Sequence, residues 1–197
     1  MSCIFNQAQT KACGTAPIGG LSVQSIYEYN YSEWREMVDA GLVTFETDGT
    51  ISAIVNGLGI KAYKKDVPSG SIVLGSTVNK VVGAYTTFTH MVNYPLINNK
   101  QLEKNVVESM TDEKRVCIVI KNSGEAEIYG NDQGMMLINT PYNPNDAVLG
   151  GMIPVELSTD PDGAKETRMP RSIFDTDTAT TIALIDGLTV AGVYINI

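Results

Sequence analysis

Short runs of alternating apolar and polar residues, separated by turns, dominate this chain of 197 residues. Alternation with a period of two predicts strands that bury one face. The clearest run is residues 85–96, where Phe88 and Val92 fall on the same predicted face. Pro95 indicates that this strand ends near a sheet edge. A second alternating run, residues 21–29, predicts another strand.

Turn signals divide the next apolar runs into pairs of strands. Asp48-Gly49 separates residues 42–46 from residues 50–55, and Asp-Gly between two apolar runs is a strong hairpin signal. Residues 61–66 and 72–82 are predicted strands on either side of a turn.

Helical periodicity is strongest in two segments. Residues 32–40 are predicted as a short helix. The segment NKQLEKNVVESM carries a narrow apolar stripe made of Leu102, Val106 and Met110. We expect this second helix to lie on a surface and to cover a sheet or a neighbour.

Residues 115–129 are predicted to form a hairpin at the centre of the fold. Residues 116–120 form an uninterrupted apolar run, which is typical of a buried strand, and residues 125–129 return after a turn. Further along, residues 153–158 predict a strand and residues 163–177 a long polar excursion. The last predicted hairpin joins residues 180–185 and 188–197 around Asp186-Gly187.

These elements predict a mainly β fold with a minor α part, an antiparallel β-sandwich or split barrel with one flanking helix. We expect a β domain with an N-terminal arm over residues 1–138. Residues 139–197 are expected to form a C-terminal extension and closing hairpin that complete the same domain. Composition agrees, because 18% charged residues and 18 glycines suit strands and turns better than long surface helices.

The formal net charge of −8 argues against affinity for DNA phosphates or an anionic membrane. No run of 18 apolar residues predicts a membrane-spanning helix. The first residues lack the features of a signal peptide, so we expect synthesis in a cytoplasm. An odd number of cysteines predicts reduced thiols, although the first two could pair: Cys3, Cys13 and Cys117.

Residue combinations typical of the common enzyme classes are missing from the sequence. The single histidine, His90, could be a general base or a metal ligand, but its place inside a predicted strand favours a structural side chain. No serine lies in a G-x-S-x-G motif, and the cysteines lack the close pairing of a zinc site. Cys117 is interpreted as a small buried hydrophobe. The sequence therefore predicts a protein that is not an enzyme and uses no cofactor or metal.

Two charged clusters have plain interpretations. Four aspartates lack the spacing of a calcium loop and are interpreted as turn residues: Asp160, Asp162, Asp175 and Asp177. Three lysines followed by Asp66 are interpreted as a solvated strand or loop: Lys61, Lys64 and Lys65.

The N-terminal arrangement MSCI…KACG…IGGLSVQSIYEYNY resembles the start of small virion proteins of tailed phages that infect Bacteroidetes and marine bacteria. The residues that carry the resemblance are Cys3, Cys13, Gly19, Gly20, Ile26 and Tyr27. It continues through the Asp48-Gly49 turn, the strands around residues 78–94, and the helix and hairpin of residues 98–134. It covers residues 1–138 and departs from the family pattern after Pro141.

The resemblance implies a tail-tube or tail-ring subunit with a tube-like fold. The expected function is a virion structural protein in a homo-oligomeric ring of a tail tube or neck, in contact with other virion proteins. DNA would pass through the ring without specific binding, for which an acidic protein is suited.

A long segment rich in glycine and proline is the predicted contact between subunits. Its residues are Lys64, Lys65, Asp66, Val67, Pro68, Ser69, Gly70, Ile72 and Val73. Strand edges that are hazards in a monomer become useful when copies pair. We expect a deletion of residues 66–82 to leave the domain folded and to prevent assembly.

Two other functions stay open. A capsid-associated decoration protein or adhesin-type binding module would present an exposed aromatic patch to a discrete ligand. A small hydrolase would depend on His90.

Overall fold

The computed structural model describes residues 25–57, 59–67, 71–80, 85–96, 100–121, 125–144 and 151–189. These residues form eleven strands and three helices, so the fold is mainly β, as predicted. In chain order the elements are β1 (Ser25–Asn30), α1 (Tyr31–Asp39), β2 (Val43–Phe45), β3 (Ile51–Ile54), β4 (Tyr63–Asp66), β5 (Val73–Asn79), β6 (Thr87–Leu96), α2 (Gln101–Asp112), β7 (Arg115–Ile120), β8 (Ala126–Tyr129), β9 (Met135–Asn139), β10 (Ile153–Thr159), β11 (Arg171–Ile173) and α3 (Thr178–Gly187).

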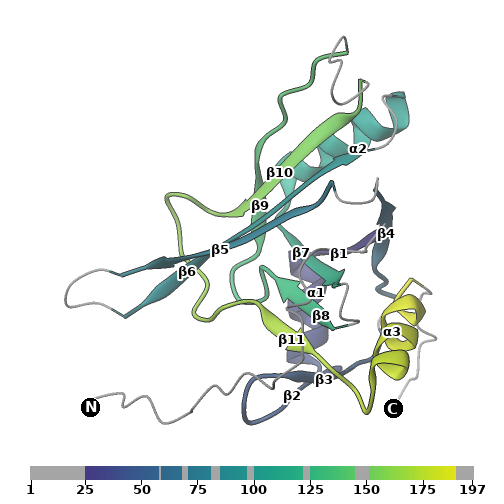
Figure 1. Cartoon of the computed structure of the whole chain (residues 1–197), viewed down its shortest axis with the longest axis vertical. Coiled ribbons are helices and arrows are strands. Elements are labelled where there is room, and N and C mark those ends of the chain that lie inside the picture. Colours follow the sequence, from purple (N-terminus) through teal and green to yellow (C-terminus); the bar gives the residue numbers. More distant parts are fainter. Residues whose placement is uncertain are drawn as a thin grey trace, which may run out of the picture.

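The described strands belong to one hydrogen-bonded sheet (Figure 1). Its main path runs β2-β3-β11-β8-β7-β9-β10-β6-β5, and β1 joins it between β4 and β7. All of the paired strands are antiparallel except β3 and β11, which are parallel. The sheet is therefore mixed, although the predicted antiparallel arrangement holds for every other pair of described strands.

The central ladder of β1 and β7 separates two hydrophobic cores. On β7, Val116 and Ile118 point into one core, whereas Cys117 and Val119 point into the other, because successive side chains of a strand alternate between its faces. Every residue of β7 except the last is buried, which confirms the predicted central strand.

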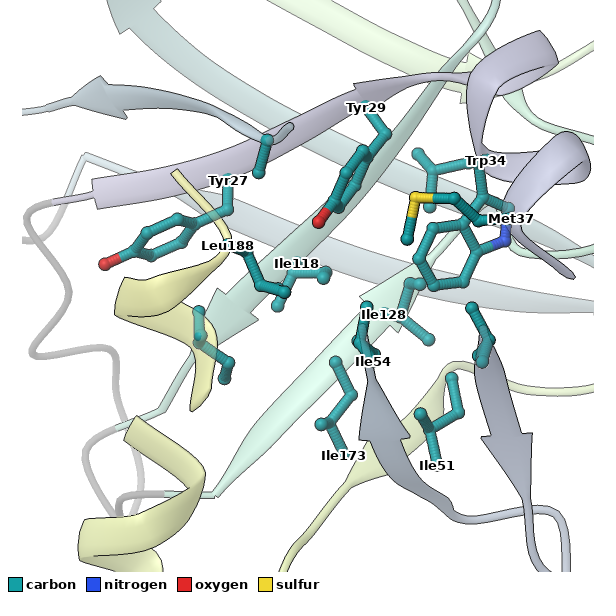
Figure 2. Packing of buried hydrophobic residues seen from close by; sticks show 14 of the residues in the cluster. Tyr27, Tyr29, Trp34, Met37, Ile51, Ile54, Ile118, Ile128, Ile173 and Leu188 are labelled. Carbon is teal, nitrogen blue, oxygen red and sulfur yellow. The ribbon is translucent and has the colours of Figure 1, made fainter. Parts of the chain in front are cut away.

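One core, here called the Trp34 core, lies between α1, α3 and the strands at the β2 end of the sheet (Figure 2). Trp34 of α1 is completely buried, and its indole nitrogen donates a hydrogen bond to Asn131 Oδ1 at 3.2 Å. This partner matters because a buried indole N–H without an acceptor destabilises a fold.

The other core, here called the Tyr94 core, is built by β5, β6, β9 and β10 and is covered by α2. The apolar stripe predicted for α2 was only partly right. Met110 and Val107 are buried, but Leu102 is 70% exposed. The helix therefore packs on the core through Val106, Val107 and Met110, whereas Leu102 points to solvent.

Several predicted turns and strands are confirmed. Asp48-Gly49 lies in the turn between β2 and β3, β7 pairs with β8, and β10 covers the strand predicted at residues 153–158. Strand β6 is not at an edge, because it lies between β5 and β10. Pro95 is tolerated there because the ladder with β5 ends at Asn93, so its missing N–H removes no bond to β5.

The predicted C-terminal hairpin was wrong. Residues 178–187 form helix α3, which places Ile185 in the Trp34 core. Asp177 caps the helix by accepting the Thr180 N–H at 2.8 Å, and this satisfies a helix N–H that has no partner within the helix. Residues 190–197 lie outside the described part of the chain.

The segment after residue 139 is built into the sheet. Strand β10 lies between β9 and β6, and β11 lies between β3 and β8. The predicted polar excursion at residues 163–177 contains β11 and one further bridge to β6. Among the described residues, no helix has the length and apolar character needed to cross a membrane.

Candidate functional site

The segment predicted to contact other subunits is partly anchored in its own chain. Lys64, Lys65 and Asp66 belong to β4 and pair with β1, with Lys65 opposite Ile26. They therefore form part of the sheet rather than a free loop.

The next residues of that segment divide between core and surface. Val67 and Ile72 are buried in the Tyr94 core, with 3% and 6% of their surface exposed. Val73, the first residue of β5, is 54% exposed. Pro68, Ser69 and Gly70 lie outside the described residues. The expected deletion of residues 66–82 would thus remove two core side chains and the whole of β5, so the expectation that the domain would stay folded does not hold.

The surface that stands out is the hairpin of β5 and β6, whose far ends extend away from the rest of the molecule (Figure 1). Strand β5 is the last strand of the sheet path, so no described strand lies on its outer side. Three large apolar side chains on this hairpin are exposed: Val73 (54%), Val78 (56%) and Tyr85 (95%).

The orientation of the N–H and C=O groups of β5 follows from the hydrogen bonding of His90 on β6. The His90 N–H donates to Thr159 Oγ1 of β10 at 3.0 Å, so the main chain of His90 faces β10. Its partner across the ladder is Ser76, and the two therefore form a pair without direct hydrogen bonds. The N–H and C=O of Ser76 consequently face outward, as do those of Leu74 and Val78.

The hairpin is also unusual in charge. No aspartate or glutamate occurs between Asp66 and Glu103, although the chain contains 22 acidic residues. Lys80 is the charged residue of this hairpin, because burial lowers the pKa of His90 to about 4 and keeps it neutral. A nearly neutral strand edge thus extends from an acidic protein.

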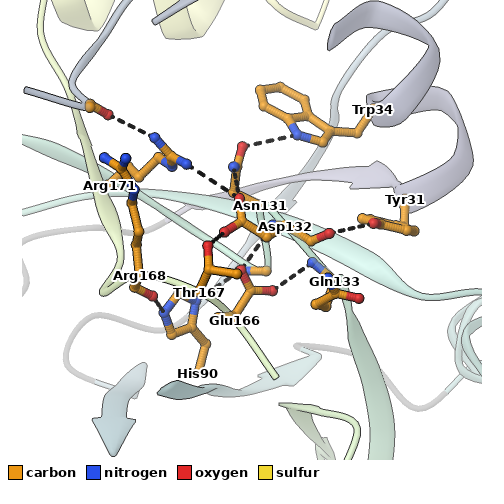
Figure 3. A network of polar contacts seen from close by, with 12 residues as sticks. Tyr31, Trp34, His90, Asn131, Asp132, Gln133, Glu166, Thr167, Arg168 and Arg171 are labelled. Carbon is orange, nitrogen blue, oxygen red and sulfur yellow. Dashed lines mark hydrogen bonds and ion pairs between the residues drawn. The ribbon is translucent and has the colours of Figure 1, made fainter. Parts of the chain in front are cut away.

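A network of polar contacts holds the base of the hairpin (Figure 3). His90 is 1% exposed, its Nδ1 accepts the Gly130 N–H at 3.1 Å, and its Nε2 lies 3.0 Å from the Arg168 carbonyl oxygen. Both ring nitrogens therefore have partners in the neutral form of the ring. The structure agrees with a structural role for His90.

Glu166 extends this network. Its carboxylate accepts the N–H groups of Asp132 and Gln133, both at 2.9 Å, and its own main chain pairs with Phe88 of β6. Burial raises the pKa of Glu166, although these two N–H groups act in the opposite direction. The carboxyl thus connects β6 to the turn after β8.

Asp132 completes the connection. Partial burial would raise its pKa, but hydrogen bonds from Thr167 and Asn131 and the charge of Arg171 hold the pKa below its usual value. Arg171 of β11 forms an ion pair with Asp132 at 3.4 Å. The base of the hairpin is therefore bound to the turn after β8 and to the segment that contains Glu166 and Arg171. These contacts fix the direction in which β5 and β6 extend.

A pocket of about 420 Å³ lies between β1, β4, β7 and α2. Its lining includes Glu28, Lys65 and Arg115. Glu28 is 1% exposed and accepts a hydrogen bond from the Tyr94 hydroxyl. Burial raises the pKa of Glu28, which the Tyr94 hydrogen bond and the charges of Lys65 and Arg115 oppose. Sequence reasoning missed this carboxyl, because a single glutamate in an alternating strand carries no signal of burial.

The other candidate chemical groups have structural roles. Burial raises the pKa of the Cys117 thiol, so this cysteine is a buried hydrophobe, as predicted. Cys3 and Cys13 lie outside the described residues. Within the described ranges, no three His, Cys, Asp or Glu side chains group together as metal ligands would.

The charged clusters also behave as structural elements. Asp160 accepts the N–H groups of Asp162 and Gly163 in a turn, and Asp177 caps α3. The turn role predicted for Asp160 is confirmed, whereas Asp177 is a helix cap rather than a turn residue. Lys64 lies 3.9 Å from an Asp186 carboxylate oxygen, which agrees with a solvated strand.

The chain matches no family model, no curated protein and no solved structure.

Proposed function

We propose that this chain is a virion structural protein that assembles with identical copies into a ring of a phage tail tube or neck, through which DNA passes. The observation that carries the proposal is the outer edge of β5, which no described strand covers, on a projecting hairpin whose base is held by polar contacts. The tube-like sandwich or barrel would then be completed by contacts between copies. The resemblance of the N-terminal residues to tail proteins of phages supports the same assignment.

An open strand edge favours association. Natural monomers protect such edges with proline, inward-facing charge or short length, because free N–H and C=O groups pair readily with another strand. The seven residues of β5 contain no proline and no charge, and Val73 and Val78 expose apolar surface beside the edge. In a ring, this edge would be paired instead of open to solvent.

The charge distribution supports passage of DNA without binding. The net charge of −8 means that the protein as a whole repels phosphates. The hairpin carries none of this negative charge, because no carboxylate lies between Asp66 and Glu103. Copies of an acidic protein repel one another, so contacts between them are most favourable where carboxylates are absent.

A second function, a decoration protein or adhesin-type binding module, is supported by a different observation. The pocket beside Glu28 is large enough for a small ligand and contains both cationic and acidic side chains. Such a module would remain a monomer, so the two functions differ in oligomeric state.

The test compares Ser76→Pro with Ser76→Ala by size-exclusion chromatography with light scattering. Proline removes an outward N–H and none of the bonds between β5 and β6, and Gly75 before it tolerates the change. The alanine control keeps the N–H and removes only a hydroxyl that is buried without a partner among the described residues.

We expect the unchanged protein and Ser76→Ala to form defined oligomers, and Ser76→Pro to elute as one folded copy. Electron micrographs of the oligomers should show rings. An unchanged protein that remains a single copy at high concentration would refute the proposal. Oligomers of Ser76→Pro that match the unchanged protein would refute the role of the β5 edge.

A further inference from the structure

Three strands have an outer side that no described strand covers: β2, β4 and β5. If the outer edge of β5 pairs with another copy, its partner on that copy is a second β5 edge, the β4 edge or the β2 edge. The first choice gives a symmetric pair of copies, whereas the other two give head-to-tail association. Main-chain direction and charge distinguish these choices.

The outer side of β4 is partly occupied. The Ala62 N–H, just before β4, donates to the Leu188 carbonyl at 2.8 Å. Lys64 lies between Asp186 and the ring of Tyr27, 5.5 Å from the ring centre. Strand β4 carries two lysines and one aspartate, so its net charge is positive and would also repel Lys80 of an incoming hairpin.

No strand of the described ranges pairs with the outer side of β2. The Leu42 carbonyl accepts the Val55 N–H at 2.9 Å, and the Glu46 N–H donates to Thr50 at 2.8 Å, so these residues face β3. Val43, which directly follows Leu42, and Phe45, which directly precedes Glu46, consequently turn their N–H and C=O groups outward.

The surroundings of β2 complement the hairpin in charge and in apolar surface. Glu46 and Asp48 follow the strand and are exposed, and they can attract Lys80. Two arginines also lie near this turn; the charge of Arg171 is paired with Asp132. Phe45 and Val55 are 36% and 55% exposed. They would cover the apolar side chains that flank the β5 edge.

From these observations we propose that the β5 edge of one copy pairs with the β2 edge of the next copy. The inference rests on the proposed function and names the partner surface for its open edge. Because β2 and β5 are the two ends of the main sheet path, the pairing joins the sheets of successive copies. Association through two different surfaces continues from copy to copy, and it produces a ring when the rotation closes.

Mixing two blocked variants tests this arrangement. Ser76→Pro blocks the β5 edge, and Phe45→Pro blocks the β2 edge. Each variant alone should elute as one copy. An equal mixture should give a species of two copies, because one variant keeps a working β5 edge and the other a working β2 edge. Ser76→Ala mixed with Phe45→Leu is the matched control and should assemble like the unchanged protein.

Charge-reversal variants of Glu46 and Lys80 test the same pairing of β5 with β2 if Phe45→Pro does not fold. Glu46→Lys and Lys80→Glu should each raise the protein concentration needed for assembly at low salt. The double variant should restore it, because the attraction is re-formed with reversed sign, and added salt should reduce all three effects.

The possible failures are distinguishable. If Ser76→Pro blocks assembly while Phe45→Pro and Glu46→Lys assemble normally, β2 is not the partner strand of β5. The proposed function stands in that case. If Phe45→Pro alone forms pairs while Ser76→Pro stays single, the symmetric contact of two β5 edges is correct instead. If both folded proline variants stay single and their mixture contains no pair, the pairing of β5 with β2 is wrong. A single copy for the unchanged protein overturns the inference together with the proposed function.

Discussion

His90 accepts a hydrogen bond from the main-chain N–H of Gly130 at 3.1 Å, across the boundary between the projecting hairpin and the body of the protein. The opposite ring nitrogen lies 3.0 Å from the Arg168 carbonyl. Since the nitrogen facing Gly130 must lack a proton, the contact is made by the neutral ring. Protonation of His90 would break it.

The stability of the protein should therefore decrease in acid because of this residue. Burial lowers the pKa of His90 from 6.5 to about 4 in the folded state. At a pH between these two pKa values, the His90 side chain binds a proton in the unfolded chain but not in the folded chain. The stabilisation is complete above pH 6.5 and is lost as pH falls through 4, by about 3 kcal/mol in all.

Urea unfolding of the unchanged protein and His90→Gln at pH 7, 6, 5 and 4 measures this effect. Glutamine keeps one donor and one acceptor but does not titrate. The difference between their free energies of unfolding should narrow toward pH 4. Parallel curves for the two proteins would contradict the assignment.

Glu28 should give the opposite pH dependence. Burial raises its folded pKa above 4.5, so the folded chain holds a proton that the unfolded chain has released. Its contribution is fully present below pH 4.5 and is lost as pH rises through the folded value. Glu28→Gln keeps an acceptor for the Tyr94 hydroxyl and cannot ionise. It should be at least as stable as the unchanged protein at pH 8.

Glu36→Gln, on the exposed face of α1, is the matched control for Glu28→Gln. Urea unfolding at pH 5 and pH 8 should show an altered pH dependence for Glu28→Gln alone. A similar slope in both variants would mean that Glu28 titrates normally.

The local sequence pattern was sufficient to predict those elements whose structure depends mainly on their own residues. The apolar run of β7 and the Asp48-Gly49 turn were correctly predicted, because continuous burial and a tight turn both leave a mark within a few residues. The same local logic failed at residues 178–187. Asp186-Gly187 between apolar runs indicates a hairpin, but the cap at Asp177 and packing on the Trp34 core make this segment a helix.

The candidate sites depend on long-range contacts that no local pattern contains. The hydroxyl that binds Glu28 belongs to Tyr94, 66 positions away, and Glu166 meets the Gln133 N–H 33 positions away. The absence of carboxylates between Asp66 and Glu103 is visible in the sequence. Its meaning appears only when β5 is found at the end of the sheet.

Gly134 should tolerate substitution less well than a glycine with the same backbone conformation elsewhere. Gly134 has φ of 71°, and an added Cβ would lie 2.9 Å from the Tyr31 ring and 2.8 Å from Lys114 Cβ. Gly41 has φ of 72° with no atom within 4 Å of an added Cβ. The backbone penalty of about 1–2 kcal/mol applies to both, and the crowding applies only to Gly134.

Thermal and urea unfolding of Gly134→Ala and Gly41→Ala should show the larger loss of stability for Gly134→Ala, by about 1 kcal/mol or more. Equal losses would indicate that Tyr31 moves aside freely. In that case the turn after β8 would be less firmly held than its hydrogen bonds suggest.

Ile72 and Val73 should separate stability from assembly at two adjacent positions. Ile72 is 6% exposed in the Tyr94 core, whereas Val73 is 54% exposed at the start of β5. Ile72→Ala should lower the free energy of unfolding by about 2–5 kcal/mol, because it leaves a cavity. Val73→Ala should change it by less than about 0.5 kcal/mol, as at other surface positions.

Assembly should respond in the reverse order, since the Val73 side chain lies beside the open edge and Ile72 does not. Below its unfolding temperature, folded Ile72→Ala should form oligomers at the same protein concentration as the unchanged protein, and Val73→Ala should need more. Urea unfolding and light scattering on the same samples give both quantities. If Val73→Ala unfolded as readily as Ile72→Ala, the start of β5 would belong to the core, and the surface available for assembly would begin further along the strand.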